Sequence, residues 1–233
     1  MMLRLPVCLL LLVGCADPFA NVPFKPDPAL WTPACDDLAI DWRDATCHDP
    51  SWQVPACGAP VLRESTDSAQ GVVSLPTPLT YADAEPLAGA HRPDAARWGE
   101  YAYLPPQRWV YNLQEGGVVA LYHPCVPASF VDDLREFLRT LPADADGGTR
   151  WILTPAPDLP TAFALLTWQH GFGANCLDLE AARAFVQAHY RHGPQETSVV
   201  GTYVYAWIGK ASGVATKPGF VPSCADAGSA DGF

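Results

Sequence analysis

The stretch that decides the fold is WGEYAYLPPQRWVYNLQEGGVVALYHPC, residues 98–125. It contains two of the eight tryptophans, a Gly-Gly pair at 116–117 and an apolar run, VVALY, at 118–122. This β-branched and aromatic content is typical of a buried sheet. We therefore predict two strands, at 109–111 and 118–122, which are joined by a turn through Gly116 and Gly117.

Two helices are predicted C-terminal to this stretch. Pro127 suits the first turn of a helix, and apolar residues recur at intervals of three and four from Phe130 to Leu141. Asp178 can cap a second helix, which the Gly-Pro pair at 193–194 would end.

Further strands are predicted at 72–75, 151–154, 162–168 and 199–208, and an exposed loop is predicted at 81–97. The order of these elements favours an α+β fold, with a mostly antiparallel sheet and two packed helices. Cysteine and proline dominate the N-terminal part, so the domain should be disulfide-stapled and begin with an irregular Pro/Cys-rich segment.

The N-terminus has the pattern of an export signal. Arg4 precedes an apolar run at 5–13 that is too short to span a bilayer. The run ends in Leu-Val-Gly-Cys, which resembles the lipobox of bacterial lipoprotein signal peptides, with Cys15 as the lipidation site. The expected partner is then a lipid bilayer, reached through the acyl chains on Cys15. An ordinary secretory signal with a chance cysteine is the alternative.

These features predict five regions along the chain. They are a lipoprotein signal peptide (1–14), a Pro-rich tether (15–34), a Cys-rich N-terminal segment (35–69), the α+β domain (70–210) and a C-terminal tail (211–233). The predicted location is the cell envelope, with the domain lipid-anchored and facing the periplasm or the cell surface. If the cell has two membranes, Ala16 after the lipidated cysteine favours the outer one.

Net charge argues against one class of partner. The chain carries a formal charge of −11, which becomes −12 when Arg4 leaves with the signal peptide. An acidic protein repels the phosphate backbone, so we do not expect nucleic-acid binding.

Six cysteines remain after Cys8 leaves with the signal and Cys15 is acylated. An even number in an exported protein predicts three disulfides, for which 15 pairings exist. We expect a bridge between Cys125 and Cys176, which both follow predicted strands. Three cysteines precede residue 60, so one of them should pair with Cys224. No C-x-x-C pair occurs, which disfavours a zinc site. The six are Cys35, Cys47, Cys57, Cys125, Cys176 and Cys224.

Three segments resemble the bacterial domain of unknown function 3105 family. They are AGAHRPDAARWGEY, WVYNLQEGGVVALYHPC, and RWILTPAPDLPTAFALLTWQ followed by Cys176. The match covers about residues 70–195. Members of this family are typically exported or membrane-anchored, and their motifs carry several histidines that would suit a metal site.

This sequence keeps few of those histidines. The loop histidine is His91, but Tyr111 occupies the position of one motif histidine and Glu115 that of another. Gln114 replaces the motif glutamate, and Gly71 falls where an upstream histidine is expected. The candidate ligand or binding residues are therefore His91, Tyr111, Gln114 and Glu115, and no resident metal or other cofactor is expected beyond a weakly bound metal.

No constellation of residues identifies a reaction. The pair His123 and Cys125 would suit a nucleophile only if Cys125 were free, and neither a G-x-S-x-G motif nor a phosphate loop occurs. We expect no catalytic residue and lean against an enzyme. The favoured hypothesis is a non-catalytic interaction or structural lipoprotein with an envelope protein partner. The alternative is a metal-binding or redox protein that retains a reduced site around His91, Tyr111 and Glu115.

Overall fold

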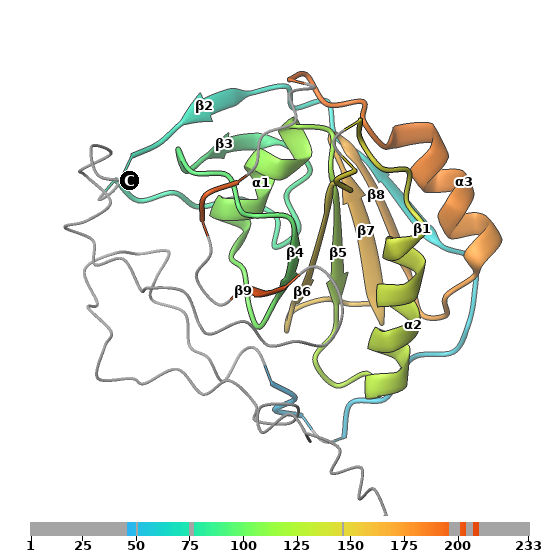
Figure 1. Ribbon diagram of the computed structural model, residues 1–233. Helices are drawn as coiled ribbons and strands as arrows, with labels where there is room; N and C mark the ends of the chain where they lie inside the picture. Colours follow the sequence, from blue (N-terminus) through green and yellow to red (C-terminus); the bar gives the residue numbers. More distant parts are fainter. Residues whose placement is uncertain are drawn as a thin grey trace, which may run out of the picture.

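A seven-stranded mixed sheet with helices on both faces forms the centre of the protein (Figure 1). The computed structural model describes residues 46–49, 51–74, 77–145, 147–195, 201–203 and 207–209. Across the sheet the strands are β1 (Val61–Glu64), β8 (His170–Ala174), β7 (Phe163–Thr167), β5 (Val118–Tyr122), β6 (Trp151–Pro155), β4 (Gly99–Tyr101) and β9 (Trp207–Gly209). Most neighbours are antiparallel, which confirms the predicted sheet, while β6 runs parallel to both β5 and β4.

Alternate residues of β5 supply two separate cores, one on each face of the sheet. Val119 and Leu121 pack with α1 (Pro106–Gln114), whereas Val118 and Ala120 pack beneath α2 (Ala128–Arg139) and α3 (Leu179–His189). All four β5 side chains are buried, as expected for a strand covered on both sides. The VVALY run is therefore the central strand of three layers, and its prediction is confirmed.

The first predicted strand, at 109–111, is wrong because these residues belong to helix α1. Pro106 stands in the first turn, where its missing N–H costs no hydrogen bond. Gly116 follows the C-cap with φ 76°, the left-handed conformation that commonly ends a helix. Trp109, Val110 and Leu113 fill one core, so tertiary packing outweighs their strand propensity.

The two predicted helices are present as α2 and α3. Pro127 is the N-cap of α2. The buried residues of this helix, Leu134, Phe137 and Leu138, face the sheet. In α3 the Asp178 side chain accepts hydrogen bonds from the backbone N–H groups of Glu180 and Ala181, as predicted for an N-cap. With α1 the described residues therefore hold three helices, one more than predicted.

The predicted loop at 81–97 is in part a buried element. Residues 89–91 form β3 (Gly89–His91), which pairs in parallel with β2 (Gln70–Val72) in a separate two-stranded sheet. Leu87, Ala88 and Ala96 join the core beside α1. Short strands with little apolar periodicity give no sequence signal, which is why β3 and β4 were not predicted. Half of the predicted strand at 199–208 lies outside the described residues, and the other half includes a bridge at Tyr203 and the start of β9.

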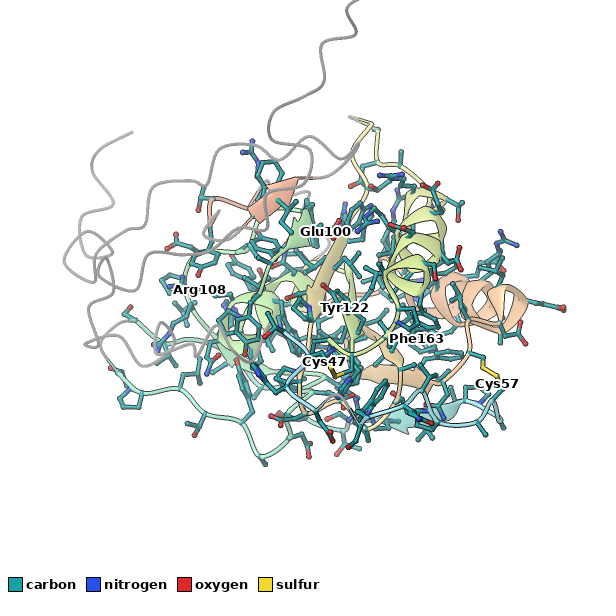
Figure 2. All side chains as sticks on the ribbon, turned by 90° about the horizontal axis from the view of Figure 1, so that it is seen from below. Cys47, Cys57, Glu100, Arg108, Tyr122 and Phe163 are labelled. Atoms are coloured by element: carbon teal, nitrogen blue, oxygen red, sulfur yellow. A yellow bond between two sulfur atoms is a disulfide. The ribbon has the colours of Figure 1, made fainter. Side chains whose placement is uncertain are left out.

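The described disulfides join Cys47 to Cys125 and Cys57 to Cys176. The predicted Cys125–Cys176 bridge is therefore wrong, although both cysteines do follow strands. Each pairs instead with the N-terminal segment, which crosses one end of the sheet before it enters β1 (Figure 2). Cys35 and Cys224 lie outside the described residues, and their pairing stays a prediction.

The N-terminal segment predicted to be irregular at 35–69 is irregular at 46–49 and 51–60, where polar contacts as well as sulfur fix it, whereas Val61–Glu64 form β1. The Asn175 side chain donates to the carbonyl oxygen of Ala56 at 3.1 Å. Its amide oxygen accepts from the backbone N–H of Ala162 at 3.2 Å, next to β7. Among the described helices, none is both long and apolar enough to cross a membrane.

Candidate functional site

Two of the predicted site residues meet between β3 and α1. His91 ends β3, Tyr111 lies in the middle of α1, and their rings stack with centroids 4.1 Å apart. His91 is 2% exposed, whereas Tyr111 is half-buried. The Nδ1 atom of His91 donates to the carbonyl oxygen of Arg92 at 2.7 Å, because a carbonyl oxygen can only accept. In the neutral ring this leaves a lone pair on Nε2.

Gly71 lies beside this pair. In the β2–β3 register Gly71 is opposite Ala90, and Val72 is opposite His91. A Cβ built on Gly71 would meet only the Cβ of Ala90, at 3.7 Å. Because successive side chains of a strand alternate between its two faces, a side chain at position 71 would share the face of Ala90, opposite that of His91. The structure therefore brings together the family positions at His91 and Tyr111, but not the one at Gly71.

Gln114 reaches the same site from the last turn of α1, and its side chain is buried against the His91 ring. Its Oε1 atom has no hydrogen-bond donor among the described residues. Glu115 is also buried, but its main-chain carbonyl turns away and accepts from Arg150 at 2.8 Å. The structure joins His91, Tyr111 and Gln114, so the predicted set is brought together in part.

Burial controls the protonation of this site. It lowers the pKa of His91 below its ordinary value, while the hydrogen bond to Arg92 and the neighbouring Gln114 side chain oppose that shift. Burial, followed by the charge of Glu115, raises the pKa of Tyr111. Near neutral pH the stack is therefore an uncharged imidazole on an uncharged phenol.

The geometry is that of packing contacts. Two stacked rings present their faces to one another, whereas two ligands of one metal must aim their lone pairs at a common point. Within the part of the chain that the structure describes, no three His, Cys, Asp or Glu side chains gather closely enough to hold a metal ion. A weak site there could use the Nε2 lone pair of His91, the Tyr111 hydroxyl and Gln114 Oε1, but not a His-rich set.

His123 and Cys125, weighed as a nucleophile pair, have structural roles. Cys125 is in a disulfide, and its backbone N–H donates to Nδ1 of His123 at 3.2 Å. The His123 ring lies flat on Trp52, with centroids 3.7 Å apart. Trp109 and Trp151 are core residues, one on each face of the sheet, so they offer no stacking surface for a sugar.

Two buried polar residues near α1, Arg92 and Asn112, leave no signal in the sequence. Arg92 is fully buried and donates to the carbonyl oxygens of Val73 and Thr77, at 3.1 and 2.7 Å. The Asn112 side chain makes two hydrogen bonds to the backbone of Ala96. A buried arginine bonded to carbonyls looks like any surface arginine in a sequence, because its partners are main-chain atoms.

Together, the layered sheet, the stacked His91–Tyr111 pair and the disulfides define a disulfide-stapled α+β domain with a packed polar site beside α1. The family model described as "Protein of unknown function (DUF3105)" matches residues 73–201, more than half of the chain. The chain belongs to that family, which confirms the resemblance. No curated protein and no solved structure matches it significantly.

Acid should weaken the fold partly through His91. Because the folded state lowers the pKa of His91, its stabilisation is complete above the ordinary value of 6.5 and is lost as pH falls below it. We expect His91→Phe, which keeps an aromatic ring on Tyr111, to lose less stability than wild type between about pH 7.5 and 5.5. At the higher pH, His91→Phe should be about 1 kcal/mol less stable than wild type, because it lacks the hydrogen bond from His91 to the Arg92 carbonyl oxygen.

Urea unfolding of both proteins at the two pH values measures this difference. His48→Asn, which changes an exposed histidine, is the control and should keep the wild-type pH dependence. Equal pH dependence in His91→Phe and wild type would mean that His91 titrates alike in the folded and unfolded states.

Proposed function

We propose that this protein is a membrane-anchored lipoprotein of the cell envelope, whose domain binds or supports an envelope protein partner without catalysis. Cys15 carries the acyl chains, residues 16–34 form the tether, and the domain faces the periplasm or the cell surface. An outer membrane is favoured where the cell has two.

The observation that carries the non-catalytic part is the packing at His91. This ring is 2% exposed, stacks on Tyr111 and donates to a main-chain carbonyl, so its face and Nδ1 edge are both used. A catalytic acid, base or ligand needs a side that a substrate can reach. At His91 and Tyr111, the family histidine positions thus hold rings that pack against one another.

Disulfides support the export part of the proposal. Cys47 and Cys57 lie in the N-terminal segment, and they are bridged to Cys125 and Cys176, which follow β5 and β8. Such bridges persist in oxidising compartments outside the cytoplasm. They also fix residues 47–57 to the domain, so that a tether from Cys15 would join the domain near Cys47 and Cys125.

Labelling with radioactive palmitate and membrane fractionation test the anchor. We expect the wild-type protein to incorporate label and to sediment with membranes, and Cys15→Ser to do neither. Cys8→Ser changes a cysteine within the same signal segment and should behave as wild type. Membrane association of Cys15→Ser would contradict lipid anchoring at this residue.

A second candidate, a metal-binding or redox protein, is favoured by one observation. The Nδ1–H of His91 is held by a backbone carbonyl, the arrangement that commonly orients a histidine ligand. Nε2 would then bind a metal with Tyr111, Gln114 and Glu115 as further oxygen donors. That site requires the Glu115 carboxylate and the Tyr111 hydroxyl to lie within ligand distance of His91 Nε2.

A further inference from the structure

Three of the six histidines, His170, His189 and His192, gather at the C-terminal end of α3. His170 on β8 and His189 in the last turn of α3 stack with ring centroids 3.9 Å apart. Phe185, one turn earlier, packs against His189 at 4.9 Å. The pair therefore joins the end of α3 to the sheet through two side chains that can each take a proton.

Charged groups surround this pair from each neighbouring element. Glu64 of β1 is opposite His170 in the strand register and favours a positive charge on His189, whereas His192, just beyond α3, disfavours it. Partial burial and the charges of His170 and His192 lower the pKa of His189, and Glu64 opposes them. Two imidazolium rings in face-to-face contact would repel one another.

The chain that leaves α3 packs directly on the C-terminal end of α1, next to Gln114. We call residues 190–195 the strap. Its backbone donates from Arg191 to the carbonyl oxygen of Gly116 at 2.8 Å, and from Gln195 to that of Gln114 at 3.1 Å. The approach is so close that a Cβ on Gly193 would lie 2.3 Å from the Gln114 oxygen. The strap is thus the immediate cover over the end of α1.

Side chains also hold the strap, and one residue in it is strained. The Tyr190 hydroxyl accepts from the backbone N–H of Arg150, and Arg191 pairs with Asp144 at 2.9 Å. Asp144 also binds Arg150, at 2.7 Å. Arg191 adopts φ 64°, a conformation that non-glycine residues keep only where the surroundings impose it. Loosening its neighbours would therefore favour a different backbone path.

We propose that His170 and His189 form an acid-sensitive latch, which holds the strap over the Gln114–Gly116 end of α1 and releases it when both rings are protonated. In the latched state the rings are neutral and stacked. In the released state they separate into water, which removes the repulsion between two imidazolium rings in contact. Acid therefore shifts the population toward the released state, which uncovers Gln114 and Glu115.

Amide hydrogen exchange of the exported, oxidised protein tests the latch. The strap amides of Arg191 and Gln195 should lose roughly ten-fold in protection between about pH 7.5 and 5.0, after correction for intrinsic exchange. The amides of Val119 and Leu121 on central β5 should hold their protection. His189→Phe keeps the ring but cannot take a proton, so its strap should stay protected at both pH values.

His48→Phe is the matched control, because it changes an exposed histidine away from α3, and it should lose strap protection as wild type does. If His189→Phe does not fold, His170→Phe applies the same test from the other ring. If strap protection falls in His189→Phe as much as in wild type, the latch is overturned, and the ion pairs of Asp144 become the alternative. Equal loss in β5 would overturn it in favour of global acid unfolding.

Discussion

Replacing Cys57 and Cys176 together by serine is expected to lower the free energy of unfolding by about 5 kcal/mol. The bridge spans 119 residues, and closing so long a loop removes much of the entropy of the unfolded chain. It also fastens an edge of the sheet, because Cys57 precedes β1 and Cys176 follows β8, its pairing partner. Urea unfolding of the exported proteins measures the loss.

The Cys47→Ser/Cys125→Ser protein is the matched comparison. Its bridge spans 78 residues, so the entropic model predicts a loss of about 4.5 kcal/mol. This bridge holds the N-terminal segment near Tyr122 but does not adjoin the β1–β8 pair. Hydrogen exchange in β1 should therefore rise more in the first variant than in the second. A loss below about 2 kcal/mol in both would show that the bridges add little to the packed sheet.

Substituting Gly116 by alanine is expected to cost about 3 kcal/mol. Left-handed backbone, at φ 76°, costs a residue with a Cβ about 1–2 kcal/mol. The new Cβ would also lie 2.8 Å from the Cα of Arg191, where the strap crosses α1, and overpacking adds about 1–3 kcal/mol. Urea unfolding is again the measurement.

Gly147 provides an unusually close control, because its φ is 81° and nothing lies within 4 Å of a Cβ built there. Gly147→Ala should therefore cost only the backbone part, about 1–2 kcal/mol. The neighbouring Gly117→Ala has no such φ, but its Cβ would meet the Trp98 ring at 2.5 Å. If Gly116→Ala costs no more than Gly147→Ala, the close contact with the strap does not exist in solution.

The Gly-Gly pair explains both the success and the main error of the sequence prediction. The pair predicts a turn, and the strand predicted after it is β5. The strand propensity of Trp109, Val110 and Tyr111 predicts a strand before it, where the structure has helix α1. Two signals pointed to a helix: prolines at 105–106 to start it and a glycine at 116 to end it.

The candidate site was predicted from the family motif more than from chemistry. His91, Tyr111 and Gln114 do converge, but through a stacking contact that residue spacing alone does not indicate. The strap was missed for a different reason. It touches α1 mostly through main-chain atoms, and such contacts leave no mark on residue types. Disulfide partners were likewise undetermined, since six cysteines allow many pairings.

The measurement that tests the central claim most directly is the metal content of the exported, oxidised protein, together with its melting temperature with and without a chelator. If the site at His91 is a packing cluster, we expect less than ~0.1 metal ion per chain and a melting temperature that the chelator leaves unchanged. About one metal ion per chain, with a chelator-sensitive melt that disappears in His91→Ala, would contradict the claim and establish a metal site there.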